Sequence, residues 1–280
     1  MAGIRIVSLT TNIPGPLAAA RLGVLGAAVT KIEPPAGDAL ESVAPRWYAQ
    51  ICANQTVVRF DLRSETGKAQ LQTLLAQADL LISAMRATAL VRLGLSWDGL
   101  QARFPRLCHV AVLGERAPFA DRAGHDLTYQ ARAGLLSPPR LPKSVTADML
   151  AAEQTVSAAL SVLLQRECTG QAFRHDVTIA DAAEALHASY EYGLTSPTGV
   201  LGGQSPYYNL YRSRDGWVAL AALEPHFLER LPAALQIERI DADTLRERFA
   251  GKSSADWDAI AALHDIPLAA LRDSQAGEPE

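Results

Sequence analysis

Short apolar runs separated by helical patterns dominate the first part of the chain. Five of these runs predict buried strands, and they cover residues 4–9, 28–33, 57–62, 78–84 and 107–113. An Ala-rich stretch at 16–25 and a leucine stripe between Ser64 and Gln77 predict helices between the strands. Strands that alternate with helices are typical of a parallel sheet covered on both faces. We therefore expect a Rossmann-like α/β domain with a mainly parallel sheet.

The pattern changes after residue 113. Residues 114–146 are rich in Gly, Pro and Arg. A long apolar helix is expected from about Ala147 to Glu167, with Thr146 as its cap and Gly170 just past its end. Residues 175–180 predict one more strand, which another helix follows.

A stretch rich in Gly and Pro divides the chain into two predicted domains. Residues 1–195 form the large α/β domain, 196–206 the linker and 207–272 a smaller α+β domain, while 273–280 are expected to be a disordered tail. The smaller domain is predicted because two short strands around an Arg-Asp-Gly turn are followed by several short helices.

Composition narrows the class of protein. Apolar residues make up 49% of the chain and charged residues 20%, as in ordinary soluble domains. A net charge of −4 gives no electrostatic case for nucleic acid, and no uncharged apolar run reaches the roughly 18 residues of a membrane span. The amino-terminal segment lacks a signal-peptide layout, so a cytoplasmic location is expected. The spacing of Cys52, Cys108 and Cys168 predicts neither disulfides nor a zinc site, and no metal is expected.

Three ionisable residues in separate segments are the candidates for chemistry: His125 in GHDLTY, Asp148 in TADML and Glu224 in ALEPHF. An imidazole and a carboxylate can act as acid and base on opposite sides of one carbon, and a second carboxylate can orient the imidazole. Taken singly, each also has an ordinary structural interpretation: a loop histidine bonded to backbone, a first-turn carboxylate favoured by the helix dipole, and a residue that starts a helix. The sequence has neither of the standard phosphate loops and no GxSxG nucleophile elbow.

A series of segments, in order, resembles the family III CoA-transferases of the CaiB/BaiF type and their relatives, the α-methylacyl-CoA racemases. The segments are the PGP turn at 14–16, LGAAVTKIEPP at 25–35, FDLRSETG at 60–67, ADLLISAMR at 78–86, RLGLSWDGL at 92–100, FPRLCHVAVLG at 104–114, DRAGHDLTYQARAG at 121–134, ADM at 147–149, RECTGQ at 166–171, VTIADAA at 177–183, YRSRDGWVALAALEPHF at 211–227 and SSADWDAIAALHDIPLA at 253–269. The resemblance runs from about residue 4 to about residue 272. It implies an enzyme that processes acyl-CoA thioesters.

The resemblance leaves two chemistries open. In the transferases, an aspartate at the position of Asp148 is the nucleophile that attacks the thioester. In the racemases, it pairs with a histidine, matched here by His125, to exchange the α-proton of a 2-methylacyl-CoA through an enolate. A glutamate matched by Glu224 supports that histidine. The GHD and LEPHF segments resemble the racemase branch, so a racemase is the preferred prediction, and a non-catalytic relative with a decayed CoA site is a further alternative.

The resemblance also implies a binding site and an assembly. Coenzyme A would enter as part of the substrate, with no permanently bound cofactor. Contacts with it are expected from Arg86, Gly124, Asp126 and Tyr129. A homodimer, with the interlocked chains typical of the family, is the expected assembly.

The chain departs from the family pattern at several places. The basic segment that normally meets the CoA nucleotide is the uncharged Ala53–Thr56, and Pro34 occupies the position of a racemase arginine. Lys31 and Arg59 are basic groups nearby with no assigned role. Met149–Glu153 is bulkier than the glycines common after the family aspartate. The sequence ends soon after DIPLAAL, where family members usually continue and return to the large domain.

Overall fold

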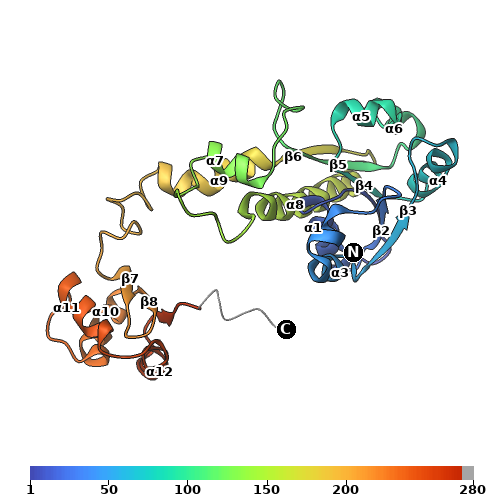
Figure 1. Ribbon diagram of the computed structural model, residues 1–280. Helices are drawn as coiled ribbons and strands as arrows, with labels where there is room; N and C mark the ends of the chain where they lie inside the picture. The colour runs from blue at the N-terminus through green and yellow to red at the C-terminus, as the bar shows by residue number, and fades with distance from the viewer. Residues whose placement is uncertain (273–280) are drawn as a thin grey trace. The chain divides into compact units, whose positions relative to one another are not determined.

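Two compact units make up the protein in the computed structural model, which describes residues 1–272. One unit covers Met1–His187 and the other begins at Ala188 (Figure 1). The linker expected at 196–206 from the sequence stays a prediction. The tail predicted at 273–280 lies outside the described residues.

A six-stranded sheet forms the centre of the first unit. Its strands are β1 (Arg5–Leu9), β2 (Ala28–Glu33), β3 (Gln55–Arg59), β4 (Leu80–Ser83), β5 (Cys108–Leu113) and β6 (Arg174–Thr178). Their order is β3-β2-β1-β4-β5-β6, and every neighbouring pair is parallel. The predicted Rossmann-like sheet is confirmed. Strand order reverses between β1 and β4, and a crevice at the carboxyl ends of the strands is expected at such a point.

Helices cover both faces of this sheet (Figure 1). The face that carries Ile6 packs against α1 (Pro14–Val24) and α8 (Thr146–Thr169). The face that carries Val7 packs against α4 (Glu65–Leu75), α5 (Ala87–Arg92) and α6 (Trp97–Arg103). The remaining helices of this unit are α2 (Ala39–Val43), α3 (Pro45–Cys52), α7 (Asp126–Arg132) and α9 (Ile179–Glu191). Neighbouring strand residues alternate between two apolar cores, which explains the near-continuous apolar runs in the sequence.

Helix α8 is the long helix that the sequence predicted. By length and composition it could cross a membrane, but 56% of its apolar window is buried inside the protein, as in a core helix. Small residues such as Ala151 and Ala159 are fully buried against the sheet and let the helix axis approach it closely. The helix ends at Gly170, which has a φ of 75°, as predicted. The predicted cap is wrong by one position, because Thr146 is the first helical residue and Val145 precedes it.

Two further differences from the prediction have a physical cause. Strand β3 starts at Gln55 and ends at Arg59 instead of covering 57–62. Its partner β2 ends at Glu33, which is paired with Arg59, so residues beyond Arg59 have no ladder to join. Helix α7 was not predicted, because its seven residues are too few to display a clear helical period.

The second unit is an α+β fold, as predicted. Its strands β7 (Tyr208–Arg212), β8 (Trp217–Ala221) and β9 (Leu268–Ala270) form an antiparallel sheet. Helices α10 (Pro225–Leu235), α11 (Ala242–Ala250) and α12 (Ser254–His264) accompany it. Buried aromatic rings hold its core together, with Phe249 stacked on Tyr211 and edge-on to Trp257, each at 5.0 Å between centroids.

Candidate functional site

A hollow of about 210 Å³, which we call the central hollow, lies beyond the carboxyl ends of β1, β4 and β5. Thr11 follows β1, Arg86 follows β4 and Gly114 follows β5, and all three line it. His125 and Asp148 line it as well. The two residues singled out from the sequence for acid and base chemistry therefore meet at the crevice expected for this sheet order.

Asp126 links the two helices that carry His125 and Asp148. His125 immediately precedes α7, and Asp148 lies in the first turn of α8. The backbone N–H of Asp148 donates to Asp126 Oδ1 over 3.1 Å, and Gln130 Nε2 donates to the other Asp126 oxygen. This bridge holds the start of α8 against α7. The backbone N–H of Asp148 is therefore occupied by Asp126.

Asp148 is a buried carboxyl group with an unusual pKa. Its exposed fraction is 8%. Burial, followed by the nearby charge of Asp126, raises the pKa of Asp148 from 3.8 to about 7. A carboxyl group that titrates near neutral pH can both give and take a proton, as an acid/base catalyst must.

This raised pKa predicts that Asp148 destabilises the folded protein at alkaline pH. The pKa of Asp148 is higher in the folded than in the unfolded protein, so ionisation of this group costs more in the folded state. The resulting loss of stability is absent below about pH 4 and is complete once the pH has risen through about 7. Asp148→Asn keeps the shape without the charge. We expect this variant to be more stable than the wild type by about 2–4 kcal/mol at pH 8, and by less than about half of that at pH 5. Urea unfolding at the two pH values measures the difference, and an equal gain at both would contradict it.

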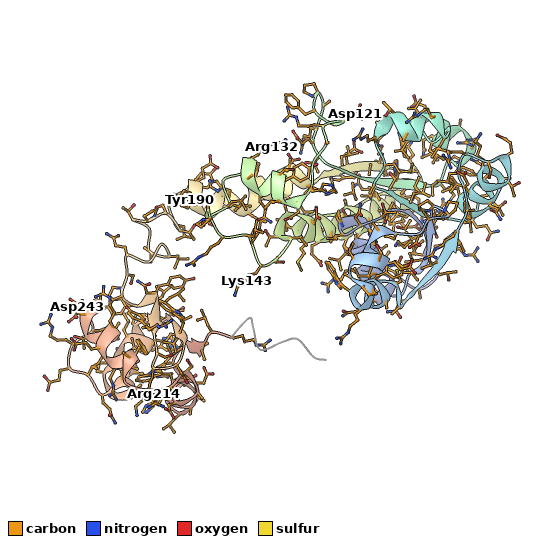
Figure 2. All side chains as sticks on the ribbon, viewed as in Figure 1. Asp121, Arg132, Lys143, Tyr190, Arg214 and Asp243 are labelled. Atoms are coloured by element: carbon orange, nitrogen blue, oxygen red, sulfur yellow. The ribbon has the colours of Figure 1, made fainter. Side chains whose placement is uncertain are left out.

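A second hollow, the outer hollow, adjoins His125 and Asp148 from another side. It has a volume of about 590 Å³. Its wall is mainly apolar and includes Ile13, Trp47, Leu127, Leu141, Pro142, Val145 and Met149. The loop that joins α7 to α8 supplies part of this wall, and Lys143 lies on that loop (Figure 2). His125 and Asp148 line both hollows, so they lie between the more polar central hollow and the mainly apolar outer hollow.

The structure places four more of the predicted site residues in the same region. Arg86, Gly124 and Tyr129 line the central hollow, and Asp126 lines the outer one. Tyr129 is buried, and a side chain at Gly124 would collide with its hydroxyl group, so Gly124 is required for packing there. Glu224 is exposed and precedes α10 in the second unit, and its support of His125 stays a prediction.

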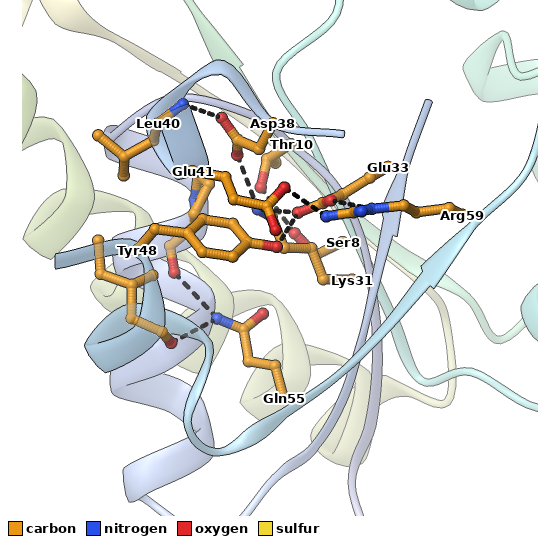
Figure 3. Close-up of polar contacts among 12 residues, drawn as sticks. Ser8, Thr10, Lys31, Glu33, Asp38, Leu40, Glu41, Tyr48, Gln55 and Arg59 are labelled. Carbon is orange, nitrogen blue, oxygen red and sulfur yellow. Dashed lines mark hydrogen bonds and ion pairs between the residues drawn. The ribbon is translucent and has the colours of Figure 1, made fainter. Parts of the chain in front are cut away.

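The structure gives partners to the added carboxylate of Glu153 and to the two basic groups that had no assigned role. Glu153, which adds a carboxylate after Asp148, forms an ion pair of 3.0 Å with Arg21, and both side chains are exposed. Lys31 is fully buried between Glu33 and Asp38, and Arg59 pairs with Glu33 (Figure 3). Lys31 therefore cannot meet a CoA phosphate, and Arg59 is already neutralised.

A third hollow, the edge hollow, extends the site along the carboxyl ends of β1 to β4. It has a volume of about 280 Å³, and Pro34, Phe60 and Met85 line it. Its described lining contains no lysine or arginine, and Pro34 lies where the resemblance places a racemase arginine. Across residues 1–272, no group of three or more His, Cys, Asp or Glu side chains is placed to hold a metal ion.

Lys31 and Asp38 were not among the predicted site residues, and Asp126 was predicted to contact CoA but not to bridge α7 and α8. Asp126 and Asp38 are each the second residue of a Gly-Asp or His-Asp pair at a helix start, which is a general capping signal. That signal predicts a helix boundary but does not identify the hydrogen-bond partners of Asp126 and Asp38, which lie 22 and 26 residues away in the sequence.

The chain is similar to several known proteins. A family model described as CoA-transferase family III matches residues 1–277. The cinnamoyl-CoA:phenyllactate CoA-transferase of Clostridium sporogenes is 27% identical over 95% of this chain and 77% of its own length. The α-methylacyl-CoA racemase of Homo sapiens is also 27% identical, over 91% of this chain and 73% of its own length. The crystal structure of Rv3272 from Mycobacterium tuberculosis aligns with a TM-score of 0.81 at 25% identity, over 98% of this chain and 83% of that one.

Proposed function

The chain belongs to CoA-transferase family III, and from that premise we propose that it is a 2-methylacyl-CoA racemase. Its substrate is an acyl-CoA thioester. His125 and Asp148 act as acid and base on opposite faces of the α-carbon, which passes through an enolate. The observation that carries this proposal is their meeting at two adjoining hollows, together with a pKa of about 7 for Asp148.

The three hollows suggest how the substrate lies. The thioester and the α-carbon sit at His125 and Asp148, and the acyl chain occupies the outer hollow, whose volume of about 590 Å³ and apolar wall suit a bulky hydrocarbon group. Coenzyme A extends along the central hollow past Arg86 and on toward the edge hollow.

The second candidate is a CoA-transferase with Asp148 as nucleophile. It is favoured by the clostridial transferase, which matches this chain with the same identity as the human racemase. A raised pKa is less suited to this role, because a nucleophilic carboxyl group must be ionised when it attacks. The presence of a histidine at position 125 likewise favours proton transfer.

Incubation of a single enantiomer of a long-chain 2-methylacyl-CoA in D2O tests the proposal. We expect deuterium at the α-carbon and formation of the other enantiomer. Acyl exchange with an added carboxylic acid, without deuterium at the α-carbon, would replace the racemase by the transferase. Neither reaction, together with no CoA binding by calorimetry, would favour a non-catalytic relative.

The assembly and location follow from the same proposal. We propose a cytoplasmic homodimer with interlocked chains, and CoA as part of the substrate instead of a resident cofactor. Light scattering of the purified protein gives its mass, and a monomer would contradict the assembly.

A further inference from the structure

The loop between β1 and α1 forms part of the wall of all three hollows. Thr11 lines the central and edge hollows, Asn12 lines the central hollow, and Ile13 lines the outer hollow. A displacement of this loop therefore changes the space for the CoA chain and for the acyl group at the same time. What fixes the loop in position matters directly to the site.

A buried carboxylate holds the middle of this loop. Asn12 has a φ of 66°, in the left-handed region that asparagine adopts more readily than most non-glycine residues. Its backbone N–H donates to both oxygens of Asp38, over 3.0 and 3.2 Å. The far end of the loop is closely packed, because a methyl group at Gly15 would lie 2.4 Å from Thr10 Cβ. The Asp38 carboxylate thus holds the middle of a loop whose end has no room for a side chain at Gly15.

Asp38 is itself held from two further directions (Figure 3). Its Oδ1 accepts the N–H of Leu40 over 3.0 Å at the start of α2, and its Oδ2 accepts from Lys31 Nζ over 2.7 Å. Asp38 is 3% exposed and Lys31 is not exposed at all. A buried carboxylate with an ammonium group and backbone donors around it has little freedom to move.

The Lys31 charge is held by a second carboxylate. Lys31 Nζ also donates to Glu33 Oε1 over 2.7 Å, and Tyr48 and Arg59 donate to the same carboxylate over 2.8 and 3.0 Å. Burial alone lowers the pKa of Lys31, but the hydrogen bonds with Asp38 and Glu33 outweigh it and keep that pKa above its ordinary value. Lys31 therefore stays positively charged beside Asp38.

We infer that Asp38 is a positioning residue for the acyl-CoA reaction, which sets the β1–α1 loop against the substrate from a buried ion pair with Lys31. Neither Asp38 nor Lys31 lines any of the three hollows. The inference rests on the proposed function for its effect on turnover. Its structural part, the restraint of Asn12 by Asp38, can be measured independently.

Asp38→Ser is the main test variant. Serine is a good helix cap, so α2 keeps its start, and Lys31 keeps Glu33, so no buried charge loses its last partner. The serine side chain is too short to hold Asn12 and Lys31 together. The matched control is Glu41→Gln, which breaks the exposed pair with Arg59 in the same network and leaves Asp38 intact. Asp38→Asn, nearly identical in shape, replaces Asp38→Ser if the latter does not fold.

Turnover of the acyl-CoA and hydrogen exchange of the Asn12 amide are measured for each variant. We expect Asp38→Ser to lower kcat by about 10- to 100-fold, because misplacement of about 1 Å at a site has effects of that size, and to lower CoA affinity by a smaller factor than kcat. We expect the Asn12 amide to exchange at least about tenfold faster. We expect Glu41→Gln to leave kcat and the exchange rate of the Asn12 amide within about twofold of the wild type.

The two readouts separate failure of this inference from failure of the proposed function. If the wild type shows no turnover, the racemase proposal fails, while the exchange rate of Asn12 still decides whether Asp38 restrains the loop. Equal exchange rates in Asp38→Ser and Glu41→Gln would overturn the inference. So would a loss of kcat, CoA affinity and melting temperature in parallel, because that pattern indicates general damage to the fold.

Discussion

Replacing Asp148 with asparagine is expected to lower the rate of α-proton exchange by about a thousandfold. General acid/base catalysis contributes ~10²–10⁴-fold, and the amide cannot carry the proton. Deuterium incorporation at the α-carbon, followed by mass spectrometry, measures the rate. The matched control is Glu153→Gln, which removes another carboxylate of α8 whose ion pair with Arg21 is exposed. The exchange rate of this variant is expected to stay within about twofold of the wild type.

His125→Gln separates the two candidate chemistries in the same assay. A racemase with one group on each face is expected to keep exchange from the enantiomer whose proton faces Asp148, but to lose inversion. A transferase that uses Asp148 as nucleophile is expected to keep acyl exchange. If Asp148→Asn retained both α-proton exchange and acyl exchange, the proposal for this site would be wrong. Because Asp148→Asn is also expected to be more stable at pH 8, lost activity in that variant cannot be attributed to unfolding.

Replacing Lys31 with methionine is expected to destabilise the protein by about 3–5 kcal/mol, the effect of removing one partner from a buried ion pair. Glu33 and Asp38 are both buried around the Lys31 ammonium. Without it, Asp38 keeps only backbone N–H donors within residues 1–272, and Glu33 keeps Tyr48 and Arg59. Urea unfolding at pH 7 measures the loss.

The pH dependence of this loss identifies its cause. Unpaired buried carboxylates have raised folded-state pKa values in the variant, so the deficit should be largest at pH 7 and should shrink as the pH falls and they become protonated. The control is Lys68→Met, which breaks an exposed pair with Glu65 and is expected to cost less than about 0.5 kcal/mol. A loss below about 1 kcal/mol for Lys31→Met would show that the buried network contributes little to stability.

A large part of the fold and the two candidate residues for acid/base chemistry could be predicted from the sequence. The strands at 4–9, 28–33 and 107–113 appear close to their predicted bounds, because buried parallel strands are apolar on both faces. The family membership followed from many short segments in one order. His125 and Asp148 were identified by their positions in that order, and the structure places both beside the central hollow.

The environment of those residues depended on the tertiary structure. Residue type and spacing do not show that Asp126 accepts the N–H of Asp148, or that burial raises the pKa of Asp148 to about 7. Lys31 and Arg59 also looked like free basic groups, whereas the structure shows both in ion pairs. Local sequence determined the apolar periodicity, the turn residues and the identity of the ionisable groups, because these are properties of short segments. Folding decided which groups became partners and which lost contact with water, because the energy of a charge depends on everything packed around it.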